Sequence, residues 1–124
     1  MTQKKYNEIL SIIASSSRHV RFAGAIGSKG ELLAYKRRDD LKPMLDANST
    51  KYHFSQVALK NDMESFFDKN LGDVEFVWEE RKKVQTIAFT IKKTTIWVSI
   101  DRKVVRTEVL RIIDTCTRLV RKHS

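Results

Sequence analysis

The sequence of 124 residues has one cysteine, one proline and four glycines, and it lacks any long hydrophobic run. A single cysteine, Cys116, can form neither an internal disulfide nor a cysteine metal site. With so little proline and glycine, no segment has the composition of a linker or a disordered tail. No apolar run approaches the ~20 residues that cross a bilayer, and residues 1–6 lack the hydrophobic core of a signal peptide. These absences predict one domain over residues 1–124 that works in the cytoplasm and does not insert into a membrane.

The sequence also has no signature of catalysis, of cofactor binding or of metal binding. His19, His53 and His123 are far apart, and none has a metal-ligand spacing to cysteine or to another histidine. No glycine-rich phosphate-binding motif and no nucleophile elbow occurs. The adjacent residues Glu79 and Glu80 would point in opposite directions on a strand, which suits solvation better than paired acid–base chemistry. We therefore predict a protein that is not an enzyme and that has no catalytic residues, cofactor or metal.

Charge is unevenly distributed along the chain, whose formal net charge is +9. Residues 1–60 contain 11 basic and 5 acidic side chains, residues 61–80 contain 1 and 7, and residues 81–124 contain 12 and 3. An acidic block therefore lies between two basic ones. This pattern favours a protein with oppositely charged faces over a uniformly cationic one.

Three apolar runs between residues 74 and 100 organise the chain. They cover residues 74–78, 84–91 and 95–100, are rich in Val, Ile, Thr and aromatic residues, and are separated by short charged breaks. Runs of this length with such short connections predict an antiparallel meander. Earlier in the chain, residues 20–26 and 32–35 flank a glycine-bounded tetrapeptide, which predicts a hairpin because glycine supplies the positive φ that such turns need.

The second and third strands of the meander have apolar residues on both faces. In residues 84–91, Ile87, Phe89 and Ile91 face one way, and Val84 and Ala88 face the other. In residues 95–100, Trp97 opposes the three aliphatic residues around it. Strands that are apolar on both sides predict helices on both faces of the sheet.

Helical periodicity predicts helices over residues 2–16, 51–71 and about 101–122. The last of these begins with Asp101 as its cap and has a buried stripe formed by Val105, Val109, Ile112, Ile113, Cys116 and Val120. The long helix over residues 51–71 has two apolar faces. One arc of about 100°, which we expect to cover the sheet, contains Tyr52, Leu59, Met63, Phe66 and Phe67. The opposite side contains Phe54, Val57 and Ala58, which are covered either by a further partner or by the apolar island at Leu41 to Leu45.

The order of elements and the first hairpin carry a resemblance to a known family. The hairpin over residues 20–34 reads Val-Arg-Phe-Ala-Gly-Ala-Ile-Gly-Ser-Lys-Gly-Glu-Leu-Leu-Ala and precedes the long helix. In this, the chain resembles the roadblock family of dynein-light-chain-like proteins within the profilin-like fold, and it looks most like small archaeal members. The resemblance implies an α+β fold with the order α-β-β-α-β-β-β-α. It also implies a five-stranded antiparallel sheet in the order 2-1-5-4-3, with the long helix on one face and the terminal helices on the other.

The resemblance further implies a homodimer, because roadblock-like proteins commonly pair their third strand and long helix across a two-fold axis. The sequence independently suggests pairing, since an edge strand rich in Val, Phe and Trp invites another strand. The predicted interface comprises Phe54, Val57, Ala58, Val74, Phe76, Val77 and Trp78.

The same sheet order would gather basic side chains at one end of the sheet. The residues concerned are Arg18, Arg37, Arg38, Arg81, Lys82, Lys83, Arg102 and Lys103, and the last helix adds Arg111 and Arg118 to the basic surface. Such a concentration can attract phosphate-rich or acidic partners. A row of basic side chains on the last helix is more often an ordinary solvated surface.

These observations lead to one main functional hypothesis and two alternatives. The main hypothesis is a non-catalytic homodimeric scaffold that, as the resemblance implies, regulates or assembles a small GTPase or another cytosolic complex. The first alternative is a nucleic-acid-binding protein that uses the basic surface. The second is a small-molecule sensor, which requires a sizeable internal pocket.

Overall fold

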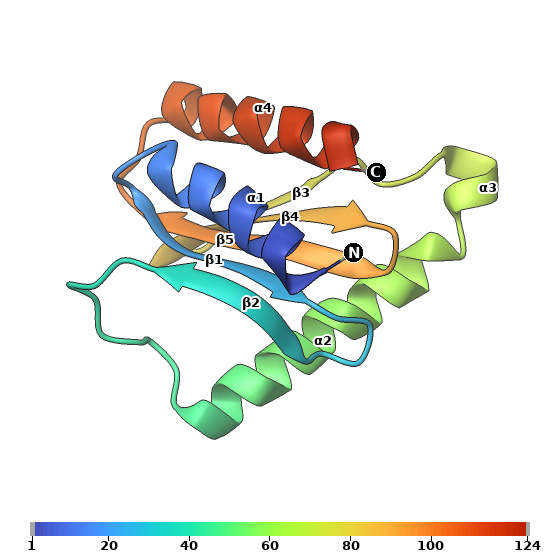
Figure 1. Ribbon diagram of the computed structural model, residues 1–124, viewed down its shortest axis with the longest axis horizontal. Helices are drawn as coiled ribbons and strands as arrows, with labels where there is room; N and C mark the ends of the chain where they lie inside the picture. Colours follow the sequence, from blue (N-terminus) through green and yellow to red (C-terminus); the bar gives the residue numbers. More distant parts are fainter. Residues whose placement is uncertain (1, 124) are drawn as a thin grey trace.

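The computed structural model describes residues 2–123, which form one antiparallel sheet with helices on both faces (Figure 1). The elements are α1 (Gln3–Ser15), β1 (Val20–Ile26), β2 (Leu32–Arg37), α2 (Ala47–Ser65), α3 (Asp68–Leu71), β3 (Val77–Glu80), β4 (Val84–Ile91), β5 (Thr94–Asp101) and α4 (Arg106–His123). The strand order is β2-β1-β5-β4-β3, with β2 and β3 at the edges. The predicted fold class and sheet order are confirmed. Within the described residues, no helix is long and apolar enough to span a bilayer.

The main core lies between the sheet and the helices α1 and α4, which lie side by side over one face (Figure 1). From the sheet, the alternating residues Ile87, Phe89 and Ile91 of β4 point into this core, together with the aliphatic residues of β5. Each of these large side chains contributes about 1.5–3 kcal/mol when fully buried. The predicted stripe of α4 is buried from Val109 to Val120, but Val105 is 69% exposed because α4 begins only at Arg106.

Helix α2 covers the opposite face of the sheet through a small patch. Phe54 and Ala58 are each 6% exposed and pack with Ile26, against half-buried Phe22 and Trp97. The prediction that the other side of the helix covers the sheet is therefore wrong, and so is the prediction that Phe54, Val57 and Ala58 are left for a partner. The small side chain of Ala58 lets the helix approach the strands. The side chains left exposed are Tyr52, Leu59, Met63, Phe66 and Phe67.

The long helix also has other bounds than predicted. It begins at Ala47 because the carboxylate of Asp46 accepts a hydrogen bond from the backbone N–H of Ser49 at 2.7 Å, a typical N-cap. This bond lowers the pKa of Asp46. The helix ends at Ser65, and the short α3 follows and stops at Gly72, whose φ is +84°.

The edge strand β3 lies three residues later than predicted. It covers Val77–Glu80, whereas Val74 and Phe76 precede it. The register with β4 pairs Val77 with Ala88 and Glu80 with Gln85, so the two glutamates extend the strand where the sequence indicated a turn. A short β3–β4 connection fixes this register more strongly than the preference of Val and Phe for strands.

Candidate functional site

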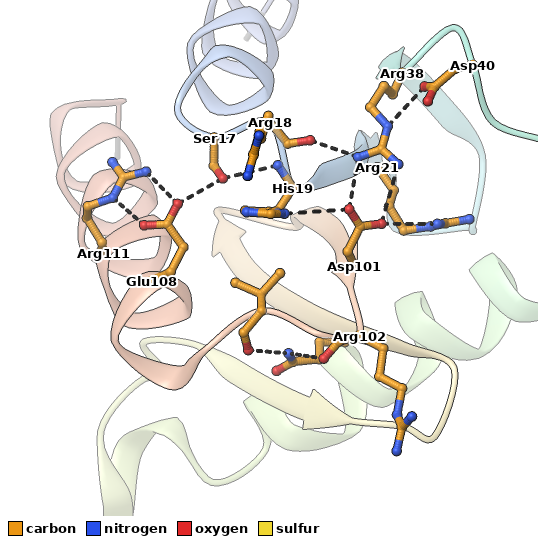
Figure 2. Close-up of polar contacts among 12 residues, drawn as sticks. Ser17, Arg18, His19, Arg21, Arg38, Asp40, Asp101, Arg102, Glu108 and Arg111 are labelled. Carbon is orange, nitrogen blue, oxygen red and sulfur yellow. Dashed lines mark hydrogen bonds and ion pairs between the residues drawn. The ribbon is translucent and has the colours of Figure 1, made fainter.

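Several strand ends meet at one end of the sheet. There β1 begins, β2 and β5 end, and β3 turns into β4, as the pairings Val20–Ile100 and Val84–Asp101 show. This topology brings together the group that we call the basic rim: Arg18, Arg37, Arg38, Arg81, Lys82, Lys83, Arg102 and Lys103. Figure 2 shows Arg18, Arg38 and Arg102 of this group around the end of β5.

Asp101 organises the centre of the basic rim (Figure 2). Its carboxylate lies 3.0 Å from Nη1 of Arg38, 3.2 Å from Nη1 of Arg21 and 3.7 Å from Nδ1 of His19. Burial opposes ionisation of this carboxyl, but hydrogen bonds from Arg38 and Arg21 outweigh it, so the pKa of Asp101 lies below its usual value. Asp101 therefore neutralises two arginines, and the prediction that it caps the last helix is wrong.

Arg38 is a structural member of the basic rim. Besides Asp101, its guanidinium donates to the backbone carbonyl of Arg18 at 2.7 Å and lies 3.0 Å from the carboxylate of Asp40. The hydrogen bond with Asp101 raises the pKa of Arg38. Its donors are thus occupied within the subunit.

The two α4 residues of the predicted basic surface lie apart. Arg111 joins the same end of the molecule, because its guanidinium lies 2.7 Å from Glu108 (Figure 2). It also donates to the carbonyl of Ser16 at 2.8 Å. Hydrogen bonds from Arg111 and Ser17 lower the pKa of Glu108 to about 2, against the effect of desolvation. Arg118 lies about two turns, or roughly 10 Å, further along α4 and is not part of the basic rim.

The rest of the basic rim is not compensated by carboxylates. Within residues 2–123, no ion pair involves Arg18, Arg37, Arg81, Lys82, Lys83, Arg102 or Lys103. Arg81, Lys82, Arg102 and Lys103 line a hollow of about 480 Å³, whose Glu80 is paired with Arg106 at 3.2 Å. The arrangement can therefore bind anions through charge.

A second, apolar hollow of similar volume, which we call the groove, adjoins the basic rim. It has a volume of about 470 Å³ and lies between the first half of α2, the loop before it and the face of the sheet beneath α2. Phe22, Phe54 and Trp97 form its aromatic floor, with ring centroids 5.7–6.1 Å apart. The predicted apolar island is found here, since Leu41, Met44 and Leu45 line the groove from the loop.

His53 lies in the groove with its ring edge-to-face against Trp97, 5.3 Å between centroids. Burial lowers the pKa of His53, the positive charge of Arg81 lowers it further, and Glu79 partly opposes both. The imidazole is therefore neutral at pH 7. The sequence predicted an ordinary histidine and did not reveal this environment, because the burial of His53 depends on the distance between α2 and the sheet.

An exposed apolar surface covers the outer side of α2 and α3. It consists of Leu59, Met63, Phe66, Phe67 and Leu71, of which Phe66 and Leu71 are each 82% exposed, and we call it the α2–α3 surface. Val74 and Phe76, from the predicted interface, are also exposed and follow α3 in the chain, whereas Val77 and Trp78 are half-buried. The indole N–H of Trp78 donates to Gln85 at 2.9 Å.

Other chemistry is sparse in the part of the chain that the structure describes. No group of three or more His, Cys, Asp or Glu side chains there could hold a metal ion. Cys116 is buried in the main core, and this burial raises the pKa of its thiol to about 12. At neutral pH the thiol is thus protonated and unsuited to nucleophilic attack.

Comparison with solved structures finds the same fold in proteins of low sequence identity. The Roadblock/LC7 domain from Streptomyces avermitilis is 15% identical, with 93% of this chain and 91% of that chain covered and a TM-score of 0.67. The gliding protein MglB from Thermus thermophilus is 16% identical, with coverages of 97% and 91% and a TM-score of 0.64. A structure of MglB with a tetrameric arrangement is 14% identical, with coverages of 100% and 96% and a TM-score of 0.66.

No protein-family model matches the sequence, and no curated protein matches it. The likeness to small archaeal members stays a prediction. The strand order, the placement of the helices and the similarity over nearly the whole chain agree with one another. The chain has the fold of the roadblock/LC7 domains, as its first hairpin and its order of elements predicted.

Proposed function

We propose that the protein is a non-catalytic interaction module that forms a homodimer in the cytoplasm through the α2–α3 surface and the neighbouring edge of β3. The observation that carries this proposal is the exposure of large apolar side chains along one side of α2 and α3. Leu59, Met63 and Phe66 follow one another at spacings of four and three residues, so they share one helical face. Contiguous apolar surface of this kind marks interaction sites in soluble proteins.

The edge of the sheet supports the same interface. Strand β3 pairs with β4 on one side only, which leaves backbone N–H and C=O groups available on the other. Val74 and Phe76 add exposed apolar area between α3 and this edge. A second copy would cover both features at once, because two-fold symmetry places the same surface on each subunit.

Proteins of similar fold suggest what such a dimer could do. The solved MglB structure with a tetrameric arrangement is an assembly of several copies, which supports self-association of this fold. The roadblock resemblance of the sequence suggests a further partner, a small GTPase or another cytosolic complex. The dimer would then be the platform on which that partner is regulated or held.

The proposal is tested by measuring the mass in solution by light scattering during gel filtration. We expect the wild-type chain of 14.4 kDa to elute as a dimer and a Leu59→Asp, Met63→Asp double variant to elute as a monomer. Val105→Asp is the matched control, since it changes an exposed apolar residue at the start of α4 and should leave the dimer intact. A monomeric wild type, or a dimer that survives the double substitution, would refute the interface.

A second candidate function is nucleic-acid binding at the basic rim. It is favoured by the rim cations without ion pairs that lie at one end of the sheet. The affinity for a short RNA or DNA duplex should fall steeply with salt, and Lys82→Gln with Lys83→Gln should reduce the slope of log K against log salt by about 2. The matched control is Lys92→Gln with Lys93→Gln, in the β4–β5 turn at the other end of the sheet. Absence of binding at low salt removes this candidate.

A further inference from the structure

The groove beneath α2 has a size and a lining that its role in packing does not explain. Its volume of about 470 Å³ lies within the range of sites that hold small organic molecules, about 300–1,000 Å³. The rings of Phe22, Phe54 and Trp97 lie at its floor, where a well-packed interior would have closed over them. Phe22 and Trp97 are therefore only half-buried at the floor, while Phe54 is buried between α2 and the sheet.

The walls of the groove are cationic. Arg21, Arg37, Arg81 and Lys42 line it, and no aspartate or glutamate of the described chain does. Arg21 is paired with Asp101, but Arg37 lies over the rings of Phe22 and Tyr35, 5.9 and 5.8 Å from their centroids, and not against a carboxylate. Neither Arg37 nor Arg81 has an ion pair within residues 2–123. The positive charges of these two guanidinium groups are thus not offset by a paired carboxylate.

The field of Arg81 reaches the interior of the groove. His53 lies against Trp97 on the floor, and after burial the charge of Arg81 is the next cause that lowers the pKa of this histidine. An anion bound beside His53 would be attracted by this same positive charge. The electrostatics of the groove therefore favour a negative ligand group.

We propose that the groove binds a small organic anion with a flat aromatic body, whose rings pack on Trp97 and Phe22 and whose acidic group is held in the positive field of the groove, to which Arg37 and Arg81 contribute. Guanidinium groups match carboxylate, sulfonate and phosphate groups through paired hydrogen bonds, and the aromatic floor matches ring edges and faces. An uncharged ligand would leave both guanidinium groups without a partner, and a purely polar anion would leave the floor uncovered.

A peptide strand fits the groove less well. Phe22 belongs to β1 and Trp97 to β5, and both strands are already paired on each side within the sheet. No backbone edge in the floor is open for strand addition. The site thus offers rings and charges, which suits a compact ligand.

The probe for this proposal is 8-anilinonaphthalene-1-sulfonate, an aromatic anion, compared with N-phenyl-1-naphthylamine, which has the same rings without the charge. The readout is the pair of indole N–H signals in a proton–nitrogen NMR spectrum of the wild-type chain, assigned with a Trp78→Phe variant. We expect the anion to shift the Trp97 signal saturably at one site while the Trp78 signal stays in place, since Trp78 packs on the other face of the sheet. The uncharged compound should bind at least about tenfold more weakly than the anion.

The arginines supply the second part of the test. Arg37→Gln with Arg81→Gln should weaken the anion about tenfold and leave the uncharged compound unchanged. Arg118→Gln with Arg121→Gln makes the same change in net charge on α4 and should leave both affinities unchanged. Probe bound at the α2–α3 surface would not shift the Trp97 signal, and Leu59→Asp should remove that part of the binding.

Four results would overturn the proposal. They are no shift of the Trp97 signal, equal affinity for the two compounds, an equal loss in the α4 control, and loss of all binding on Leu59→Asp. The Trp97 signal of the wild-type chain reports binding in the groove and not the oligomeric state, so failure of this test is distinguishable from failure of the homodimer proposal.

Discussion

The two faces of the sheet differ in what they are made of. Beneath α1 and α4, β4 and β5 present Ile87, Phe89, Ile96 and Val98, all 0–1% exposed, in one continuous core. Beneath α2, the same two strands present Thr86, Thr90, Thr95 and Ser99, with Trp97 as their large ring. One face is closed by aliphatic packing and the other leaves a groove. The fold therefore rests mainly on the first face, which frees the second for binding.

The largest expected effect compares one phenylalanine from each face. Phe89→Ala should lower the free energy of unfolding by about 3–5 kcal/mol, because it opens a cavity in the closed core. Phe22→Ala should cost only about 1 kcal/mol, because half-buried Phe22 borders a groove that is already open. Urea titration followed by circular dichroism measures both.

Equal losses for the two phenylalanines would contradict the comparison between the faces. Phe89→Leu provides a milder change if the alanine variant does not fold, and it should still cost more than Phe22→Leu. The exchange keeps an apolar side chain at both positions, so it isolates the effect of packing.

Polar and apolar side chains of similar shape give a second, smaller comparison. Val98→Thr should cost about 1–3 kcal/mol, because it buries a hydroxyl in the aliphatic core. Thr86→Val should be close to neutral, since the hydroxyl of Thr86 makes only a long contact of 3.4 Å with Glu79 and its methyl-bearing shape is kept. Unfolding curves of both variants against wild type measure the difference.

A marked loss on Thr86→Val would show that the hydroxyls beneath α2 hold that side together. The space of the groove would then result from polar packing between α2 and the sheet, and would not be a surface available to a ligand. We expect instead that the affinity of the groove for an aromatic anion survives this substitution.

The sequence alone predicts the closed face better than the open one. Alternation in β4 assigns Ile87, Phe89 and Ile91 to one side, and the structure confirms it. The faces of α2 could not be assigned in this way, because both are apolar and the larger arc, with Leu59 and Met63, has more area to bury. The choice depends on how closely the helix can approach the sheet, and this favours the small residue Ala58.

The candidate site depends on the same distance between α2 and the sheet. The gathering of basic side chains at one end of the sheet follows from strand order, and the structure places Arg37 and Arg81 there. Which of these cations are neutralised does not follow from strand order, since Asp101 was expected to cap a helix and instead binds Arg21 and Arg38. The groove itself has no signal in the sequence, because it arises from side chains that fail to fill a space.

The smallest expected effect concerns the pH dependence of stability on the open face. Burial and the charge of Arg81 lower the pKa of His53 below its ordinary value of 6.5, with Glu79 in partial opposition. Below pH 6.5 the unfolded chain therefore binds a proton that the folded chain resists, and stability falls as the pH falls through that window. In His53→Gln the decrease in the midpoint of urea unfolding between about pH 7.5 and about pH 5 should be smaller than in wild type.

Two further groups sharpen the test of His53. Arg81→Gln should act in the same direction but more weakly, because burial is the first cause of the shift and remains. The carboxylate of Glu108, whose pKa is about 2 in the folded protein, contributes equally in wild type and in His53→Gln, so it does not affect the difference between their slopes. If the midpoint of urea unfolding changed equally with pH in wild type and His53→Gln, the histidine would ionise as freely in the folded protein as in the unfolded chain. The groove would then be too well solvated to disfavour a charge.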